Sequence, residues 1–84
     1  MYYVYVLREE KGKLYIGYSS NLRRRIEEHG AGKVRYTRGG KWELVYYEAY
    51  KSSKDARKRE KKLKLDGRSK YHLKKRIENS LRID

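Results

Sequence analysis

The chain has 84 residues, and its 24 lysines and arginines against 11 aspartates and glutamates give a formal net charge of +13. This length allows one domain with a small core, and the positive field favours polyanionic partners, above all nucleic acid. No apolar run approaches the roughly 20 residues of a spanning helix, and the lack of cysteine excludes disulfides and thiolate metal sites. Because no signal-peptide pattern opens the chain, we expect an intracellular, cytoplasmic location and no membrane partner.

Two segments near the start predict a β-hairpin. Residues 2–7 (YYVYVL) and 13–18 (KLYIGY) are rich in β-branched and aromatic residues, with a polar turn around Gly12 between them. Side chains alternate between the two faces of a strand, so Tyr3 and Tyr5 share the face opposite to the valines. The hairpin therefore offers an aliphatic face to a core and a tyrosine face to another partner.

The next segment predicts a short helix that begins after Asn21, a favourable N-cap residue. Leu22, Ile26 and His29 recur at helical spacing. Gly30 suits the C′ position, so we expect the helix to end just before it.

Residues 31–41 (AGKVRYTRGGK) hold four positive charges and three glycines. We expect a mobile basic loop, which is either a solvated linker or a functional element. If it binds nucleic acid, the candidate contact residues on this loop and the preceding helix are Arg24, Lys33, Arg35, Arg38 and Lys41.

The second half of the chain predicts one strand and two helices. Residues 42–50 (WELVYYEAY) have strand composition, and a capping-box-like sequence at Ser52 starts a helix over 53–65. Asp66-Gly67 breaks it, and a basic helix follows over 69–82. The predicted order β-β-α-β-α-α is an α+β fold, a single domain over 1–84 with a three-stranded antiparallel sheet flanked by helices.

Glu60 is an acid within the basic run Lys58-Arg59-Glu60-Lys61-Lys62. It shares one helical face with Ala56 and Leu63, and an inward-facing carboxylate is costly unless it is paired or binds a metal. The alternatives are therefore an ion pair, with Arg25 or Arg59 as partner, and a metal site.

Arg25 and His29 lie four residues apart and therefore share a helical face. An arginine can hold a phosphate through two parallel hydrogen bonds, and a histidine can donate to phosphate or move a proton near neutral pH. The alternative is that both are ordinary surface residues, because a helix with Arg23, Arg24 and Arg25 has a solvated side in any case. Tyr5 and Tyr15 both project from the tyrosine face of the hairpin. They form either a cross-strand aromatic pair or, with cations nearby, a source of a phenolate base.

These residues together resemble the GIY-YIG nuclease domain, and most of all its small stand-alone bacterial and archaeal members. The resemblance covers about residues 2–64, and several motifs agree in order and spacing. The matching positions are Tyr5, Tyr15-x-Gly17, Arg25, His29 and Glu60 after the third strand. Tyr3-Val4 stands where the family's first triplet has Gly-Ile, and the first asparagine after Glu60 is Asn79.

The resemblance implies roles for the matching hairpin positions. Tyr15 corresponds to the family's general base, and Tyr5 to the tyrosine that ends the first triplet and assists it. Gly17 corresponds to the glycine that lets backbone or nucleic acid approach closely.

The resemblance also implies roles for three helical positions. Arg25 would steady the scissile phosphate, and His29 matches a frequent histidine at the end of the same helix. Glu60 would hold one divalent metal ion, Mg²⁺ or Mn²⁺.

The function expected from this resemblance is a metal-dependent endonuclease that hydrolyses phosphodiester bonds in DNA. No base-reading helix is evident, so we expect a preference for DNA structure rather than sequence, and DNA repair or recombination would use such an activity. Two other hypotheses explain the charge: a non-catalytic nucleic-acid-binding module that keeps the fold, and a basic structural protein on ribosomal RNA.

Overall fold

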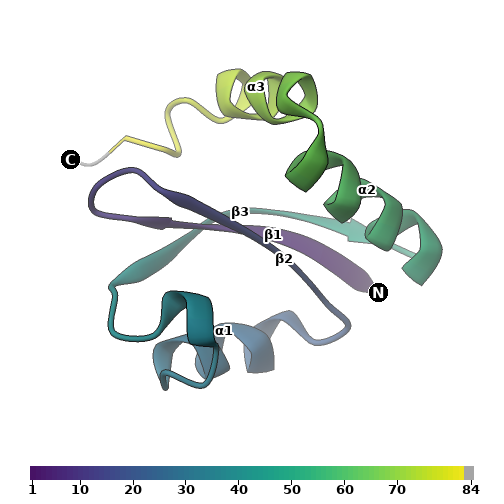
Figure 1. Ribbon diagram of the computed structural model, residues 1–84. Coiled ribbons are helices and arrows are strands. Elements are labelled where there is room, and N and C mark those ends of the chain that lie inside the picture. The colour runs from purple at the N-terminus through teal and green to yellow at the C-terminus, as the bar shows by residue number, and fades with distance from the viewer. Residues whose placement is uncertain (83–84) are drawn as a thin grey trace.

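The computed structural model describes residues 1–82 and has the predicted element order β-β-α-β-α-α (Figure 1). The elements are β1 (Tyr2–Glu9), β2 (Leu14–Ser19), α1 (Leu22–Gly30), the 3₁₀ helix η1 (Arg35–Thr37), β3 (Trp42–Tyr50), α2 (Ser53–Leu65) and α3 (Gly67–Arg76). None of the helices in this described part of the chain is long and apolar enough to cross a membrane. The α+β class predicted from the sequence is confirmed.

The sheet is antiparallel throughout, and β1 lies between the two other strands in the order β2-β1-β3. Helix α1 and η1 cover one face of the sheet, and α2 and α3 cover the other (Figure 1). This arrangement explains the composition of β1 at its centre, because the middle of a strand with both faces covered must be apolar or aromatic. The four residues at its centre, 4–7, are all buried.

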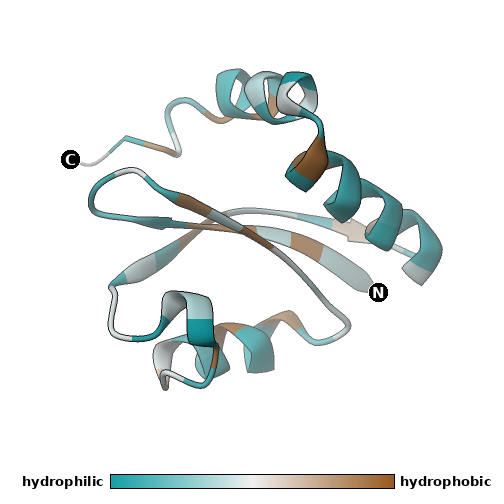
Figure 2. Cartoon of the chain, in the orientation of Figure 1, coloured by the Kyte–Doolittle hydropathy of each residue, from teal (hydrophilic) through white to brown (hydrophobic). Residues whose placement is uncertain are grey.

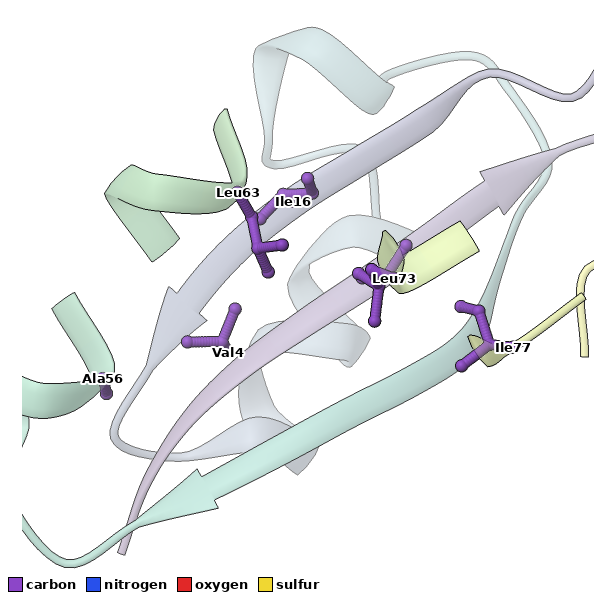
Figure 3. Close-up of a cluster of buried hydrophobic side chains, with 7 residues drawn as sticks. Val4, Ile16, Ala56, Leu63, Leu73 and Ile77 are labelled. Carbon is purple, nitrogen blue, oxygen red and sulfur yellow. The ribbon is translucent and has the colours of Figure 1, made fainter. Parts of the chain in front are cut away.

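The main hydrophobic core lies between the sheet and the α2–α3 pair (Figure 3). Each helix contributes a narrow apolar stripe, and the remaining positions of both are mostly hydrophilic (Figure 2). The buried members of this core are Val4, Val6, Ile16, Ala56, Leu63, Leu73 and Ile77. The aliphatic face of the predicted hairpin is thus the core face.

The last helix differs from the predicted range of 69–82. It begins at Gly67 because the Asp66 side chain caps it, accepting hydrogen bonds from the Arg68 backbone N–H at 3.2 Å and the Ser69 hydroxyl at 2.8 Å. It ends at Arg76, and Ile77, 7% exposed, enters the core from the turns that follow. The same aspartate that breaks α2 therefore starts α3.

The end of α1 also differs from the prediction. Gly30 is the last helical residue rather than the C′ position. Gly32 takes the left-handed conformation instead, with φ +74°, and the next N–H, of Lys33, bonds the Glu28 carbonyl at 3.0 Å. Either glycine could end the helix by its backbone freedom, and the chain uses the one further on.

The expected mobile basic loop over 31–41 is instead a packed segment that contains η1. Val34 is 9% exposed and Thr37 is 1% exposed. The Arg38 side chain returns to the segment's start and donates from Nε to the Gly32 carbonyl at 2.8 Å. The buried side chains of Val34 and Thr37 hold this segment against the sheet, beneath its exposed basic residues.

We expect Leu63→Ala to lower the free energy of unfolding by about 2–5 kcal/mol, because it leaves a cavity at a fully buried core position. Leu65→Ala is the matched control on the same helix. Its side chain is 75% exposed, so its effect should stay within about 0.5 kcal/mol. Urea unfolding followed by circular dichroism measures both, and equal losses would contradict the described packing of α2.

Candidate active site

The tyrosine face of the hairpin is built around one close contact between β1 and β2. Tyr5 and Gly17 are cross-strand partners, and a Cβ on Gly17 would stand only 2.3 Å from both Cζ and the hydroxyl oxygen of Tyr5. The Tyr5 ring therefore lies directly over Gly17, in the space that the side chain of any other residue at position 17 would occupy. On this face the backbone at Gly17 is covered by the chain's own ring.

A chain of hydrogen bonds starts from the buried Tyr5 hydroxyl. His29 Nε2 lies 2.7 Å from that oxygen, and Arg25 Nε donates to it at 3.4 Å. On the other side of the imidazole, His29 Nδ1 lies 2.8 Å from Thr37 Oγ1, whose hydroxyl donates to the Val34 carbonyl at 3.4 Å. We name Tyr5, Tyr15, Arg25, His29 and Thr37 the tyrosine–histidine cluster.

Only one direction of donation satisfies this whole chain. Thr37 gives its proton to a backbone carbonyl, so it must accept from Nδ1–H of His29. That tautomer leaves Nε2 as an acceptor, and the Tyr5 O–H donates to it while accepting from Arg25. His29 is therefore a neutral imidazole with its proton on Nδ1.

The electrostatics of the cluster agree with this assignment. Burial lowers the pKa of His29, and the charge of Arg25 lowers it further. Burial likewise raises the pKa of Tyr5 to about 12, although the hydrogen bond from Arg25 partly offsets the effect. The hydrogen bond to Tyr5 and the bond to Glu28 raise the pKa of Arg25. At neutral pH Arg25 is therefore a cation beside the neutral rings of Tyr5 and His29.

Arg25 lies at the margin of the cluster with its side chain 35% exposed. Glu28 accepts from its Nη1 at 3.1 Å and Tyr5 accepts from its Nε. Among the contacts described for residues 1–82, none uses Nη2. The guanidinium is thus oriented by two protein partners and still offers donors to an anion.

Tyr15 packs against both Tyr5 and His29 and is only partly buried. Its ring centroid is 6.2 Å from Tyr5 and 5.0 Å from His29. Tyr36 and Trp42 complete the surroundings at 5.5 Å and 6.5 Å. Tyr15 therefore joins the buried polar chain to an aromatic surface that includes the exposed Tyr36.

The predicted nucleic-acid contacts surround this face of the molecule. The Arg24 side chain is 64% exposed, and the four basic residues of the 31–41 segment are exposed as well. They are Lys33, Arg35, Arg38 and Lys41.

Glu60 lies on α2 and therefore on the other face of the sheet. Its carboxylate, 15% exposed, accepts from Lys64 Nζ at 3.0 Å and lies 3.9 Å from Arg57 Nη1. The partners predicted for an ion pair, Arg25 and Arg59, are wrong, because they bind Glu28 and Glu48 instead. Arg25 lies on α1, on the other side of the sheet. Arg59 lies on α2 next to Glu60, but its side chain points toward Glu48 of β3.

The side of α2 that carries Arg57 and Glu60 nevertheless lies near the edge strand β2. Arg57 stacks on the Tyr18 ring of β2, with Cζ 3.8 Å from the ring centroid. Tyr18 and Tyr15 project from opposite faces of the same edge strand. The cluster and Glu60 thus flank β2 from its two sides.

A single carboxylate is the metal ligand that these residues offer. Within residues 1–82 no three His, Asp or Glu side chains converge as a metal-binding group. Mg²⁺ usually keeps several waters and needs only one or two carboxylates, so Glu60 fits this ion once its exposed lysine partner moves aside. The Lys64 side chain is 45% exposed and flexible.

Three residues of this region, Thr37, Tyr36 and Trp42, were not predicted from the sequence. Thr37 carries no signal in the sequence, because its role depends on a contact with His29 made in three dimensions. Tyr36 and Trp42 were visible as aromatic residues next to positive charges, a pattern that accompanies nucleic-acid stacking surfaces.

The family of this fold is shown by comparison with known proteins. Residues 1–79 match the family model of the GIY-YIG catalytic domain. The chain therefore belongs to the GIY-YIG family, whose fold is a nuclease fold, and a nuclease domain implies a nucleic-acid substrate.

Its similar proteins within that family are small UPF0213 proteins. One from Clostridium perfringens is 41% identical over 81 residues, which cover 94% of this chain and 76% of the relative. One from Natronomonas pharaonis is 44% identical over 71 residues, covering 82% and 84%. The solution NMR structure of a UPF0213 protein from Bacillus halodurans is 40% identical, with a TM-score of 0.56 and coverage of 87% of this chain and 82% of that chain.

We expect Gly17→Ala to destabilise the protein by about 1–3 kcal/mol or more, because the new methyl group overlaps the Tyr5 ring. Gly30→Ala is the control. A Cβ there meets nothing within 4 Å, and alanine favours a helix over glycine. Thermal unfolding compares the two variants, and an unchanged melting temperature for Gly17→Ala would contradict the described Tyr5 position.

We expect Thr37→Val to cost about 1–3 kcal/mol, because it removes the acceptor from a buried N–H while keeping the side-chain shape. Thr37→Ser keeps the hydroxyl and should recover most of the loss. ¹⁵N NMR of the imidazoles measures the tautomer directly, with His72 as an internal reference. A population of Nδ1–H at His29 that is equal in wild type and Thr37→Val would argue against the positioning role.

Proposed function

We propose that this protein is a divalent-metal-dependent endonuclease that hydrolyses phosphodiester bonds in DNA, recognising DNA structure rather than sequence and serving repair or recombination. The observation that carries the proposal is the ordered chain from Arg25 through Tyr5 to His29, with Tyr15 at its accessible margin. A purely structural cluster has no need of an arginine that keeps donors exposed.

Within this proposal Tyr15 is the general base. Tyr5 is fully buried, its pKa is raised to about 12 by burial, and its O–H already donates a hydrogen bond to His29. The partly exposed Tyr15 can contact an attacking water and accept its proton. Tyr5 and His29 would act as positioning residues that hold Tyr15 and Arg25 in place.

Arg25 would bind a non-bridging oxygen of the scissile phosphate. Glu28 and Tyr5 fix the orientation of its guanidinium before substrate arrives, which lowers the entropic cost of holding the phosphate. Its donors would then stabilise the charge that develops on the phosphoryl oxygens.

Glu60 is the residue that would hold the divalent ion, Mg²⁺ or Mn²⁺. When bound, such an ion supplies charge stabilisation to the phosphate and the leaving 3′ oxygen. Glu60 lies on the other face of the sheet from Tyr15, and its helical neighbour Arg57 stacks on Tyr18 of β2, the edge strand that also carries Tyr15. The assignment of the ion to Glu60 rests on the family resemblance.

A second candidate function is a nucleic-acid-binding module without catalysis. The observation that favours it is the pairing of Glu60 with Lys64 and Arg57, which neutralises the one carboxylate the metal would need. This alternative predicts salt-dependent binding without metal-dependent cutting.

The experiment measures cleavage of labelled single-stranded, duplex and branched DNA in Mg²⁺, in Mn²⁺ and in EDTA. We expect Arg25→Ala to reduce the rate about 10²–10³-fold, the loss typical of one donor to a developing oxyanion, and Glu60→Gln to abolish the metal-dependent rate. Arg24→Ala is the matched control, since it removes the same charge from the adjacent exposed position.

Two outcomes would count against the nuclease proposal. If wild type binds all three DNA forms and cuts none, the binding module replaces it. If Arg24→Ala and Arg25→Ala lose activity equally, the effect is one of general charge, and the assignment of Arg25 to the phosphate fails.

A further inference from the structure

The positive charge of this protein is concentrated on the face of the sheet opposite to the tyrosine–histidine cluster. Residues 53–76, which form α2 and α3, hold twelve lysines and arginines against three acids. Their net charge of +9 is most of the +13 of the whole chain. The ribbons of both helices are accordingly hydrophilic over most of their length (Figure 2). The tyrosine–histidine cluster and the basic residues around it therefore do not account for the larger part of the positive field.

A pocket of about 200 Å³ lies between these two helices. Leu73 forms its apolar lining, and the polar lining residues are Arg59, Ser69, His72 and Arg76. The three polar residues from α3 are spaced i, i+3 and i+7, which places them on one side of that helix. The donors of two helices thus converge on one small pocket, which we name the α2–α3 pocket.

Hydrogen bonds to Glu48 hold the Arg59 side chain in one orientation beside the α2–α3 pocket. It donates to the Glu48 carboxylate from Nε at 3.0 Å and from Nη2 at 3.0 Å, and the hydroxyls of Tyr46 and Tyr50 donate to the same carboxylate. Burial raises the pKa of Glu48, but the bonds from Arg59 and the tyrosines outweigh it and lower the pKa overall. Glu48 therefore stays ionised and fixes one edge of the guanidinium.

The other side of that guanidinium remains available. Among the contacts described for residues 1–82, none uses Nη1 of Arg59. Arg76 and His72 are exposed and add donors that have no carboxylate partner among the described ion pairs. Ser69 alone is engaged, by the Asp66 cap. A preoriented arginine beside a free arginine suits an oxyanion such as phosphate.

We propose that the α2–α3 pocket receives a backbone phosphate of nucleic acid, so that α2 and α3 form a second nucleic-acid contact on the side of the sheet away from the tyrosine–histidine cluster. The inference shares with the proposed function only the assumption that nucleic acid is the ligand. It requires no cleavage and no metal.

An anionic membrane is the other polyanion that such a face could meet. Membrane-surface helices need a broad apolar face as well as basic residues. On α2 and α3 the exposed large apolar or aromatic side chains are limited to Leu65 and Tyr71, because the aliphatic stripes of both helices are used by the core. The observations therefore favour nucleic acid.

The test compares two double variants of α3 in binding to a short labelled DNA duplex in EDTA, followed by fluorescence anisotropy over a salt series. His72→Gln/Arg76→Gln removes the pocket donors. Lys74→Gln/Lys75→Gln removes two full charges from exposed positions that do not line the pocket. Because the control removes at least as much charge, a larger loss in the pocket variant cannot come from net charge.

We expect the pocket variant to bind about tenfold more weakly, as for the loss of one charge-assisted contact, with a salt slope smaller by about one. The control should lose clearly less. Equal losses in the two variants, or full affinity in the pocket variant, would overturn the proposal. Sedimentation with phosphatidylserine vesicles that depends on His72 and Arg76, without such dependence for the duplex, would assign the pocket to a lipid headgroup and overturn it also.

Cleavage in Mg²⁺ is measured separately on the same variants. Pocket-dependent duplex binding without cleavage by wild type would remove the nuclease proposal and leave this inference standing. If wild type cleaves and the two variants lose binding equally, the nuclease proposal stands and the inference about the α2–α3 pocket fails.

Discussion

The candidate site depends on the close contact between the Tyr5 ring and Gly17. This contact places a phenol hydroxyl beneath α1, where His29 and Arg25 both reach it. His29 in turn binds Thr37 and so fixes the basic segment that follows α1. One glycine in an edge strand thus determines how β1, β2, α1 and η1 meet. The contact needs no charge, which suits a group that is fully removed from water.

The three-layer arrangement separates two kinds of surface. On the α1 side a small number of cations surround buried neutral rings, so the field there is local and directed by Arg25. On the α2–α3 side the charges are many and mostly exposed, and they act together over the distance that salt allows. Edge strand β2 joins the two, because Tyr15 and Tyr18 project from its opposite faces.

Sequence patterns predicted the parts of this structure that depend on local chemistry. The strand over 2–7, the Asn21 cap and the break at Asp66 follow from side-chain alternation and hydrogen bonding within a few residues. Sequence patterns failed where a contact between residues far apart in the chain determines the local structure. The 31–41 segment has the composition of a loop, yet its buried Thr37 bonds to His29. The roles of Tyr5, Tyr15 and Arg25 came from the family resemblance, since their separate patterns left a structural explanation open.

Glu48 and Glu60, two of the acids on the α2 side of the sheet, differ in how firmly they are held, and this difference bears on metal binding. Glu48 accepts from Arg59 through both carboxylate oxygens and from two tyrosine hydroxyls, in a partly buried network. Removing it from those partners would leave several donors unsatisfied. Glu60 is held by Lys64, whose exposed ammonium is flexible and solvated, and by a long contact to Arg57. Exposed ion pairs of this kind contribute only about 0–1 kcal/mol. Of these two acids, Glu60 is therefore the one at which the proposed metal ion would replace a protein cation with the smaller cost to the fold.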